Sequence, residues 1–209
     1  DQTWKLNNEW QVFWLTPFKE TIKLEADMLI PRSIAHWWDA FRLRDVVLST
    51  GARNYMDQLS TSRQYREAFD ANGLPDVYNG LMYFRYSQTA ARFFETARSV
   101  FLNWPTVAKE LTKVSDDAAT TDMAYAVVCK IMGIEQTTIP AADFINFTHM
   151  KPGINGWPET TEFHKGMNVI IEAPRIRVNN VEQYHPFHYH YKDFITDEIV
   201  KEYERVLGI

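Results

Sequence analysis

The stretch at residues 21–34, TIKLEADMLIPRSI, constrains the fold of this chain more than any other. It is largely apolar and is stopped by Pro31, a pattern that predicts a β-strand over residues 22–30. Alternate residues of a strand point to the same face, so Glu25 and Asp27 are expected side by side. The fold must therefore accommodate two neighbouring carboxylates at the end of a buried strand.

Two adjacent carboxylates repel each other, and a divalent cation between them makes the arrangement favourable. Oxygen ligands of this kind fit Mn²⁺ or Mg²⁺ better than Zn²⁺. A different interpretation is a strand end whose acids face water or cap the next segment. The residue types alone leave both interpretations open.

The composition predicts a packed globular protein. Of 209 residues, 45% are hydrophobic and 14% aromatic, which favours a sizeable core and argues against a disordered chain. The net charge of -5 gives no general attraction to nucleic acid or to an anionic membrane. No apolar run of about 18 residues and no signal-peptide pattern occurs, so we expect a cytoplasmic location. The single cysteine, Cys129, cannot form an intrachain disulfide and is expected to be a buried thiol.

Short apolar runs alternate with amphipathic stretches along the chain, which predicts an α/β fold. Strands are expected at residues 45–49, 77–84 and 143–149, with a strand pair at 167–171 and 175–178. Helices are expected at residues 87–104, within 116–134, and from Thr196 to the end. These elements predict a core domain over residues 1–160 and a hairpin-and-helix appendage over residues 161–209.

Polar residues stand out at three places in this pattern. Asn79 and Gly80 interrupt an apolar strand, which indicates either a close approach of a ligand or a β-bulge. Asp122 lies near a predicted helix start, where a carboxylate complements the helix dipole. His149 and Lys151 adjoin a glycine-containing loop whose backbone is free to approach an anion.

Four stretches of the chain resemble one family. LEADMLI resembles the DxD strand "ylDaDmlv" of GT-A glycosyltransferases, especially the glycogenin-like and galactosyltransferase-like members of glycosyltransferase family 8. VYNGLMYF is similar to that family's "fNaGvmvf" strand, TDMAYAV to its "DQdaln" helix start, and FTHMKPGINGW to its late "HfxGxxKPW" loop. The four follow the family's order, between about residues 16 and 157. The resemblance implies a GT-A-like mixed sheet flanked by helices.

The resemblance also implies an activity, a metal-dependent transfer of a sugar, with retention of configuration, from a nucleotide-diphosphate donor such as a UDP-sugar. Glu25, Asp27 and His149 would hold a Mn²⁺ or Mg²⁺ ion on the diphosphate, with Glu25 standing where the family usually has aspartate. Lys151 would contact the diphosphate. The acceptor is unknown, and nucleic acid is not indicated.

The remaining residues carried over from the family concern the donor. Asn79 and Asp122 would be catalytic and orient the sugar, while Gly80 and Gly153 would belong to the donor-binding backbone. A nucleotide-binding front half precedes the DxD strand in this family, yet only 24 residues precede Glu25. We therefore expect the fold to be N-terminally incomplete, and we favour a front half that lies ahead of the first residue. Two alternatives are a front half supplied by a partner chain or second copy, and a chain that no longer binds a nucleotide sugar by the usual route.

The C-terminal segment QYHPFHYHYKDF holds a competing site. His188 and His190 at period two would bind a transition metal from one strand face. The simpler interpretation is an edge strand whose aromatic residues are packed and whose histidines, including His185, face water. The aromatic residues could also form a platform for the sugar acceptor or a dimer contact. Two other functions compete with the transferase: a binding or assembly protein on a degenerate transferase scaffold, and a metal-binding protein centred on these histidines.

Overall fold

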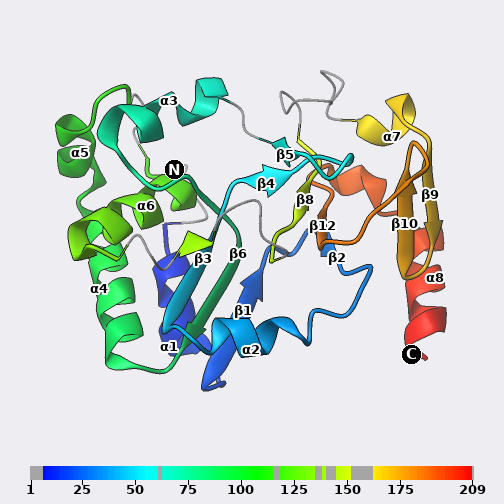
Figure 1. The fold of residues 1–209 in the computed structure, drawn as a ribbon, viewed down its shortest axis with the longest axis horizontal. Helices are drawn as coiled ribbons and strands as arrows, with labels where there is room; N and C mark the ends of the chain where they lie inside the picture. Colours follow the sequence, from blue (N-terminus) through cyan, green and yellow to red (C-terminus); the bar gives the residue numbers. More distant parts are fainter. Residues whose placement is uncertain are drawn as a thin grey trace. The chain divides into compact units, whose positions relative to one another are not determined.

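The computed structural model describes residues 7–60, 63–114, 118–134, 138–139, 145–151 and 162–208. Its elements form two compact units that alternate along the chain (Figure 1). Unit 1 is Asp1–Lys23, Trp38–Thr50 and Arg63–Pro140, and unit 2 is Leu24–Trp37, Gly51–Ser62 and Ala141–Ile209. The boundary predicted after residue 160 falls outside the described residues and stays a prediction.

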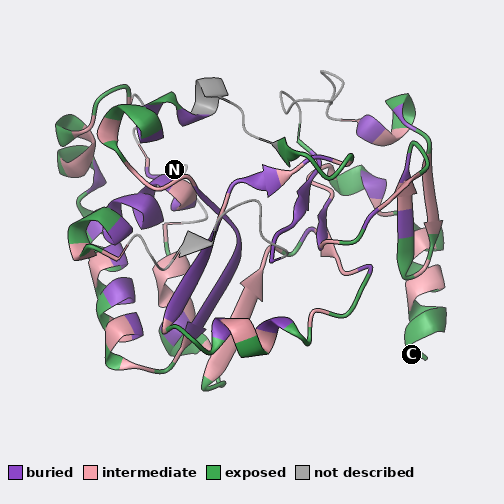
Figure 2. Cartoon of the chain, viewed as in Figure 1, coloured by how far each residue is buried: buried purple, intermediate pink, exposed green. Residues whose placement is uncertain are grey.

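Unit 1 is built on a four-stranded mixed sheet with the strand order β1-β6-β3-β7. The strands are β1 Glu20–Leu24, β6 Val77–Arg85, β3 Val46–Thr50 and β7 Thr138–Ile139. β3 runs antiparallel to β6 and parallel to β7. Every residue of β6 except Arg85 is buried, as Figure 2 shows, which explains why its sequence is a nearly continuous apolar run. The strands predicted at residues 45–49 and 77–84 are confirmed.

Two longer helices cover this core. α4, Gln88–Leu102, begins after Ser87, whose hydroxyl oxygen accepts a hydrogen bond from the Ala90 N–H. The helix is the one predicted at residues 87–104, and its buried face consists of Ala90, Phe93, Phe94, Ala97, Val100 and Phe101. α6, Thr121–Met132, is capped by Thr120 and ends at Gly133, whose φ of 65° is left-handed. Cys129 is a buried free thiol in α6, as predicted.

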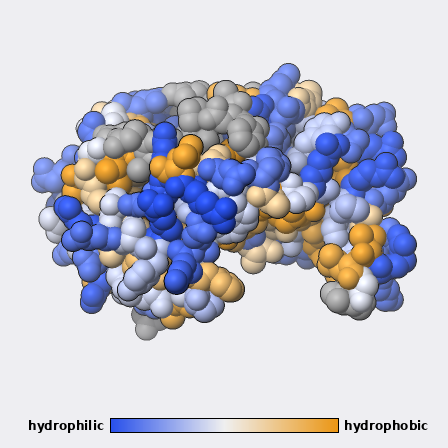
Figure 3. All heavy atoms as spheres, turned by 60° about the horizontal axis from the view of Figure 1, so that its bottom comes forward, coloured by the Kyte–Doolittle hydropathy of each residue, from blue (hydrophilic) through white to orange (hydrophobic). Residues whose placement is uncertain are grey.

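The other helical segments of the first two thirds of the chain are mostly short. They are α1 Val12–Leu15, α2 Trp37–Phe41, α3 Arg63–Asn72 and α5 Trp104–Val107, with 3₁₀ turns at Glu9–Gln11 and Ala108–Glu110. Among the described residues, none of the helices has the length and hydrophobicity needed to cross a membrane. On the face shown in Figure 3, hydrophobic and hydrophilic side chains are interspersed.

Unit 2 contains a five-stranded mixed sheet with the order β2-β12-β8-β4-β5. Its strands are β2 Met28–Leu29, β12 Phe187–His188, β8 Thr148–His149, β4 Ala52–Arg53 and β5 Leu59–Ser60. β8 runs parallel to both β12 and β4, whereas β12 is antiparallel to β2. β12 lies between β2 and β8, which places a late segment of the chain beside an early one.

An antiparallel three-stranded sheet and two helices complete unit 2. The strands are β9 Val169–Glu172, β10 Arg175–Val178 and β11 Val181–Glu182, and the helical segments are α7 Phe163–Gly166, Lys192–Phe194 and α8 Asp197–Leu207. The predicted strand pair is therefore confirmed in β9 and β10. α8 starts after Thr196, whose side chain accepts from the Ile199 N–H, as the predicted cap requires. A second core, including Phe163, Phe187 and Phe194, lies in this unit.

The strand predicted over residues 22–30 is wrong as one continuous element. β1 ends at Leu24, residues 25–27 form a turn, and β2 begins at Met28. The break is needed because β1 pairs in the sheet of unit 1 while β2 pairs with β12 in unit 2. Of the strand predicted at residues 143–149, only β8 forms, and residues 143 and 144 lie outside the described part of the chain.

Candidate metal centre

β12 brings three distant segments of unit 2 together. His188, on β12, is paired with Met28 of β2 on one side and with His149 of β8 on the other. The backbone N–H of Tyr189 donates a hydrogen bond of 3.1 Å to the carbonyl oxygen of Asp27. The turn that carries both predicted acids is therefore held against the end of β12.

Both acids of this turn approach one imidazole. Nε2 of His188 lies 3.2 Å from Glu25 Oε2 and 3.1 Å from Asp27 Oδ2. His188 is 5% exposed and Asp27 is 6% exposed. Nevertheless, among the described residues neither oxygen meets the geometry of a hydrogen bond to this nitrogen. A buried nitrogen beside two carboxylates, without a hydrogen bond of its own, suits a metal ligand.

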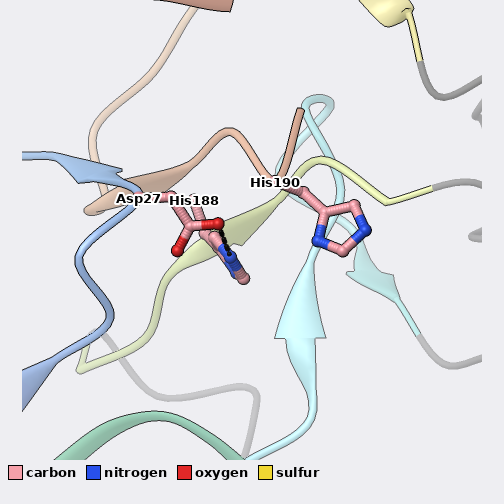
Figure 4. Close-up of side chains that lie close together, drawn as sticks. All are labelled: Asp27, His188 and His190. Carbon is pink, nitrogen blue, oxygen red and sulfur yellow. Dashed lines mark ion pairs between the residues drawn. The ribbon is translucent and has the colours of Figure 1, made fainter. Parts of the chain in front are cut away.

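A second imidazole joins the pair. One ligand atom from each of Asp27, His188 and His190 lies within 4.8 Å of the others. Figure 4 shows Asp27 and His188 in contact, with the His190 ring to one side of them. Two ligands about 2.1 Å from one ion and at right angles to each other are about 3.0 Å apart, so the spacing of Asp27 and His188 fits shared coordination. The donor set fits a divalent metal ion.

His149, predicted as a ligand, contacts the other nitrogen of the His188 ring. The Nδ1 atoms of the two histidines are 2.8 Å apart, and only one of them can donate the shared hydrogen. When His188 Nδ1 donates, the lone pair of its Nε2 faces Glu25 and Asp27. Metal-bound histidines commonly donate their second N–H in this way. The structure thus places His149 where it would fix the tautomer of His188, and its role as a direct ligand stays a prediction.

Burial and local charges favour the metal-binding forms of Asp27 and His190. Burial raises the pKa of the Asp27 carboxyl. Contacts with His188 and with Lys192, whose Nζ is 2.6 Å away, lower this pKa by more than burial raises it, so the pKa lies well below its usual value. Burial lowers the pKa of His190, and the charge of Lys151 acts in the same direction. At neutral pH this leaves a carboxylate and a neutral imidazole, the forms that bind metal ions.

Lys192 is a candidate that the sequence did not single out. It follows His188 by four residues in HYHYK, and it reaches an acid 165 positions away. The predicted diphosphate ligand Lys151 is exposed just after β8, and its charge acts on His190. The predicted Gly153 lies outside the described residues. The spacing of His188 and His190 in the sequence did indicate a metal site. No local sequence pattern, however, links residues 188–192 to Asp27.

The two predicted catalytic residues, Asn79 and Asp122, lie together in unit 1. Asp122 Oδ1 accepts a hydrogen bond of 2.8 Å from the Asn79 backbone N–H, and Oδ2 accepts one of 3.0 Å from Arg66 Nη2. The Asn79 side-chain N–H₂ donates to Glu9, whereas its buried Oδ1 has no hydrogen-bond partner in the described part of the chain. Gly80 is the next residue of β6 and is buried. The catalytic role of these residues stays a prediction.

His185 is separate from the histidine cluster. Its Nε2 is 3.1 Å from Asp57 Oδ1, and burial lowers its pKa. His188 and His190, in contrast, face Asp27, so the expectation that the tail histidines lie in water is wrong for His188, which is buried. The structure therefore groups both histidines of the competing site with Asp27 of the acidic site predicted from the sequence.

Comparisons of this chain with protein-family models, with curated proteins and with solved structures gave no match.

Proposed function

We propose that the chain is a metal-dependent glycosyltransferase that moves a sugar from a nucleotide-diphosphate donor, on a GT-A-like scaffold. The observation that carries this proposal is the convergence of Glu25 and Asp27, the acids of the DxD-like motif, on buried His188. Two carboxylates and one histidine are the donor set that the sequence resemblance implies. In the proposal His188 takes the ligand position expected for His149. The mixed α/β architecture is compatible with such a scaffold.

The residues around the cluster suit a reaction that releases a diphosphate. Transfer breaks the bond between the anomeric carbon and the diphosphate oxygen, and negative charge develops on the departing group. A divalent ion held by Glu25, Asp27 and His188 would neutralise part of that charge. Lys192 contacts Asp27 while most of its side chain is exposed, so its ammonium group can also reach an anion there. Lys151 would add a second positive charge near His190.

The proposal keeps the sugar-orienting roles that the resemblance gives to Asn79 and Asp122. Asn79 Oδ1 is a buried acceptor without a partner among the described residues, and a sugar hydroxyl would satisfy it. Both oxygens of Asp122 already accept hydrogen bonds from the chain, one of them from the Asn79 backbone. We therefore assign Asp122 as a positioning residue that acts through Asn79.

The test is release of nucleotide diphosphate from a panel of UDP-sugars in the presence of Mn²⁺, measured for the full chain. Release should need the metal and fall by about 100-fold or more in Asp27→Asn, because each lost charge-stabilising group costs about 100- to 1,000-fold. Asp57→Asn is the matched control, since Asp57 is an exposed acid of unit 2 bound to His185, and it should retain wild-type release. Absence of both UDP release and UDP-sugar binding, with metal bound, would refute the proposal.

A non-catalytic metal-binding protein is the second candidate. It is favoured by the histidine content of the cluster and by the engagement of Asp122 with buried Arg66, which gives that carboxylate a structural role. This alternative requires metal binding without any affinity for nucleotide sugars. Calorimetric titration of UDP into the metal-loaded chain separates the two candidates, because only the transferase should bind it.

A further inference from the structure

We propose that His190 is a further protein ligand of this ion and that, together with His188, it makes the centre selective for transition-metal ions such as Zn²⁺ and Co²⁺ over Mg²⁺ and Ca²⁺. The inference rests on the metal site of the proposed function, but it does not depend on sugar transfer. The sequence resemblance supplies one histidine, whereas the structure groups two with Asp27.

The backbone at His190 has an unusual conformation beside the cluster. β12 ends at His188, and His190 adopts a φ of 55°, in the left-handed region that few residues other than glycine occupy. Such a conformation persists where surrounding contacts hold it, and it is frequent at ligand sites. The His190 ring centroid lies 5.9 Å from that of His188 and 6.0 Å from that of His149. His190 is therefore part of a compact group of three imidazoles.

The donor atoms determine which ions this centre prefers. Mg²⁺ and Ca²⁺ take oxygen ligands, and Mg²⁺ retains several waters, so two imidazoles contribute little to their binding. Imidazole nitrogen suits Zn²⁺, Co²⁺ and other first-row transition ions. A centre with two histidines and at least one carboxylate should therefore discriminate by ligand type. Carboxylates alone, as the sequence predicts at Glu25 and Asp27, would give the opposite preference.

The side chains that contact the candidate ligands are compatible with this assignment. Lys192 Nζ contacts Asp27 Oδ2, and a carboxylate has about four lone-pair positions, so Asp27 can bind the lysine and a metal ion together. His149 can accept the hydrogen of His188 Nδ1 and so leave Nε2 open. The ligands are thus oriented by groups that are not ligands themselves.

The experiment measures metal binding by the full chain without nucleotide. Zn²⁺, Co²⁺, Mn²⁺ and Mg²⁺ are titrated by calorimetry, and the visible absorption of bound Co²⁺ reports its coordination. The variant is His190→Asn, because asparagine tolerates the left-handed backbone conformation while the imidazole is removed. His185→Asn is the matched control from the same segment. Circular dichroism verifies that both variants keep the wild-type fold.

The wild type should bind Zn²⁺ at least about 100-fold more tightly than Mg²⁺. His190→Asn should weaken Zn²⁺ and Co²⁺ binding at least about 10-fold, since even groups behind the ligands contribute that much, and it should change the Co²⁺ spectrum. His185→Asn should bind as the wild type does. Equal affinity of the wild type for Mg²⁺ and Zn²⁺, or unchanged Co²⁺ binding in a folded His190→Asn variant, would overturn the inference.

The outcomes separate this inference from the proposed function. A chain that binds Zn²⁺ through His190 but has no affinity for UDP-sugars would retain the inference and remove the transferase proposal. Metal-dependent UDP release together with unchanged metal binding in His190→Asn would retain the transferase proposal and remove this inference.

Discussion

Replacing Arg66 by methionine should destabilise unit 1 more than any surface substitution. The Arg66 side chain is fully buried, with Nη2 at 3.0 Å from Asp122 Oδ2 and Nε at 3.3 Å from Asp76 Oδ1. Its Nη1 donates to the carbonyl oxygen of Val77, and its guanidinium lies 3.4 Å from the centre of the Tyr78 ring. One cation therefore compensates two carboxylates and ties α3 to the start of β6.

The magnitude follows from which groups lose their partner. Removal of one member of a buried ion pair costs about 3–5 kcal/mol in free energy of unfolding, because the other charge is left uncompensated. Methionine keeps much of the apolar packing on Tyr78. The Asp122 side chain is 19% exposed and that of Asp76 is 33% exposed, so water relieves part of the penalty. We therefore expect the lower end of the range, about 3 kcal/mol.

Urea denaturation followed by tryptophan fluorescence measures this loss. Asp122→Asn should cost less, about 1–2 kcal/mol, because Asn keeps an acceptor for the Asn79 N–H and Asp76 remains as a counter-ion. Arg92→Met, an exposed position on α4, is the control and should stay within about 0.5 kcal/mol of the wild type. A loss below about 1 kcal/mol for Arg66→Met, or a loss equal to that of the control, would refute the reasoning.

Three further outcomes follow from single contacts. Burial and a hydrogen bond to Glu20 raise the pKa of Tyr83 to about 12, above its unfolded value of about 10. The stabilisation by Tyr83 is therefore complete below pH 10 and is lost as the pH rises through 12. Urea denaturation across this pH range should show the loss in the wild type, and Tyr83→Phe should lack this pH-dependent part of the stability. Thr120→Ala removes the cap that accepts from Met123 and should cost about 1 kcal/mol in urea denaturation. The Cys129 thiol is buried and should react with a thiol reagent only after unfolding, so rapid labelling of the native chain would contradict its placement.

The elements with a complete local signal could be predicted from the sequence. α4 carries its apolar residues at helical spacing and has a serine cap, and β6 is largely apolar because all of its residues except Arg85 are buried. These signals depend only on residues within each element. The hairpin of β9 and β10 was predictable for the same reason, since its two strands are adjacent in the chain.

The path of the chain between the two sheets could not be predicted in this way. The run that contains Glu25 and Asp27 has the apolar pattern of one strand, but its halves pair with β6 and with β12 respectively. A hydrophobic pattern tells which residues are buried and not which partner buries them. The two acids are close together, as expected, although they meet at a turn rather than on one strand face.

The histidine of the candidate centre shows the same limit. His149 and His188 are register partners on adjacent parallel strands, so a sequence pattern that selects one of them cannot exclude the other. Strand pairing decides which histidine lies next to the acids. β12 pairs on both sides, so that Nε2 of His188 lies near Glu25 and Asp27 while its Nδ1 faces His149. Asp27 and Lys192 are 165 positions apart, and they meet only after β12 has paired with β2. The unfolded chain therefore contains all the candidate ligands but not the centre, and the proposed metal binding would be thermodynamically coupled to the folding of unit 2.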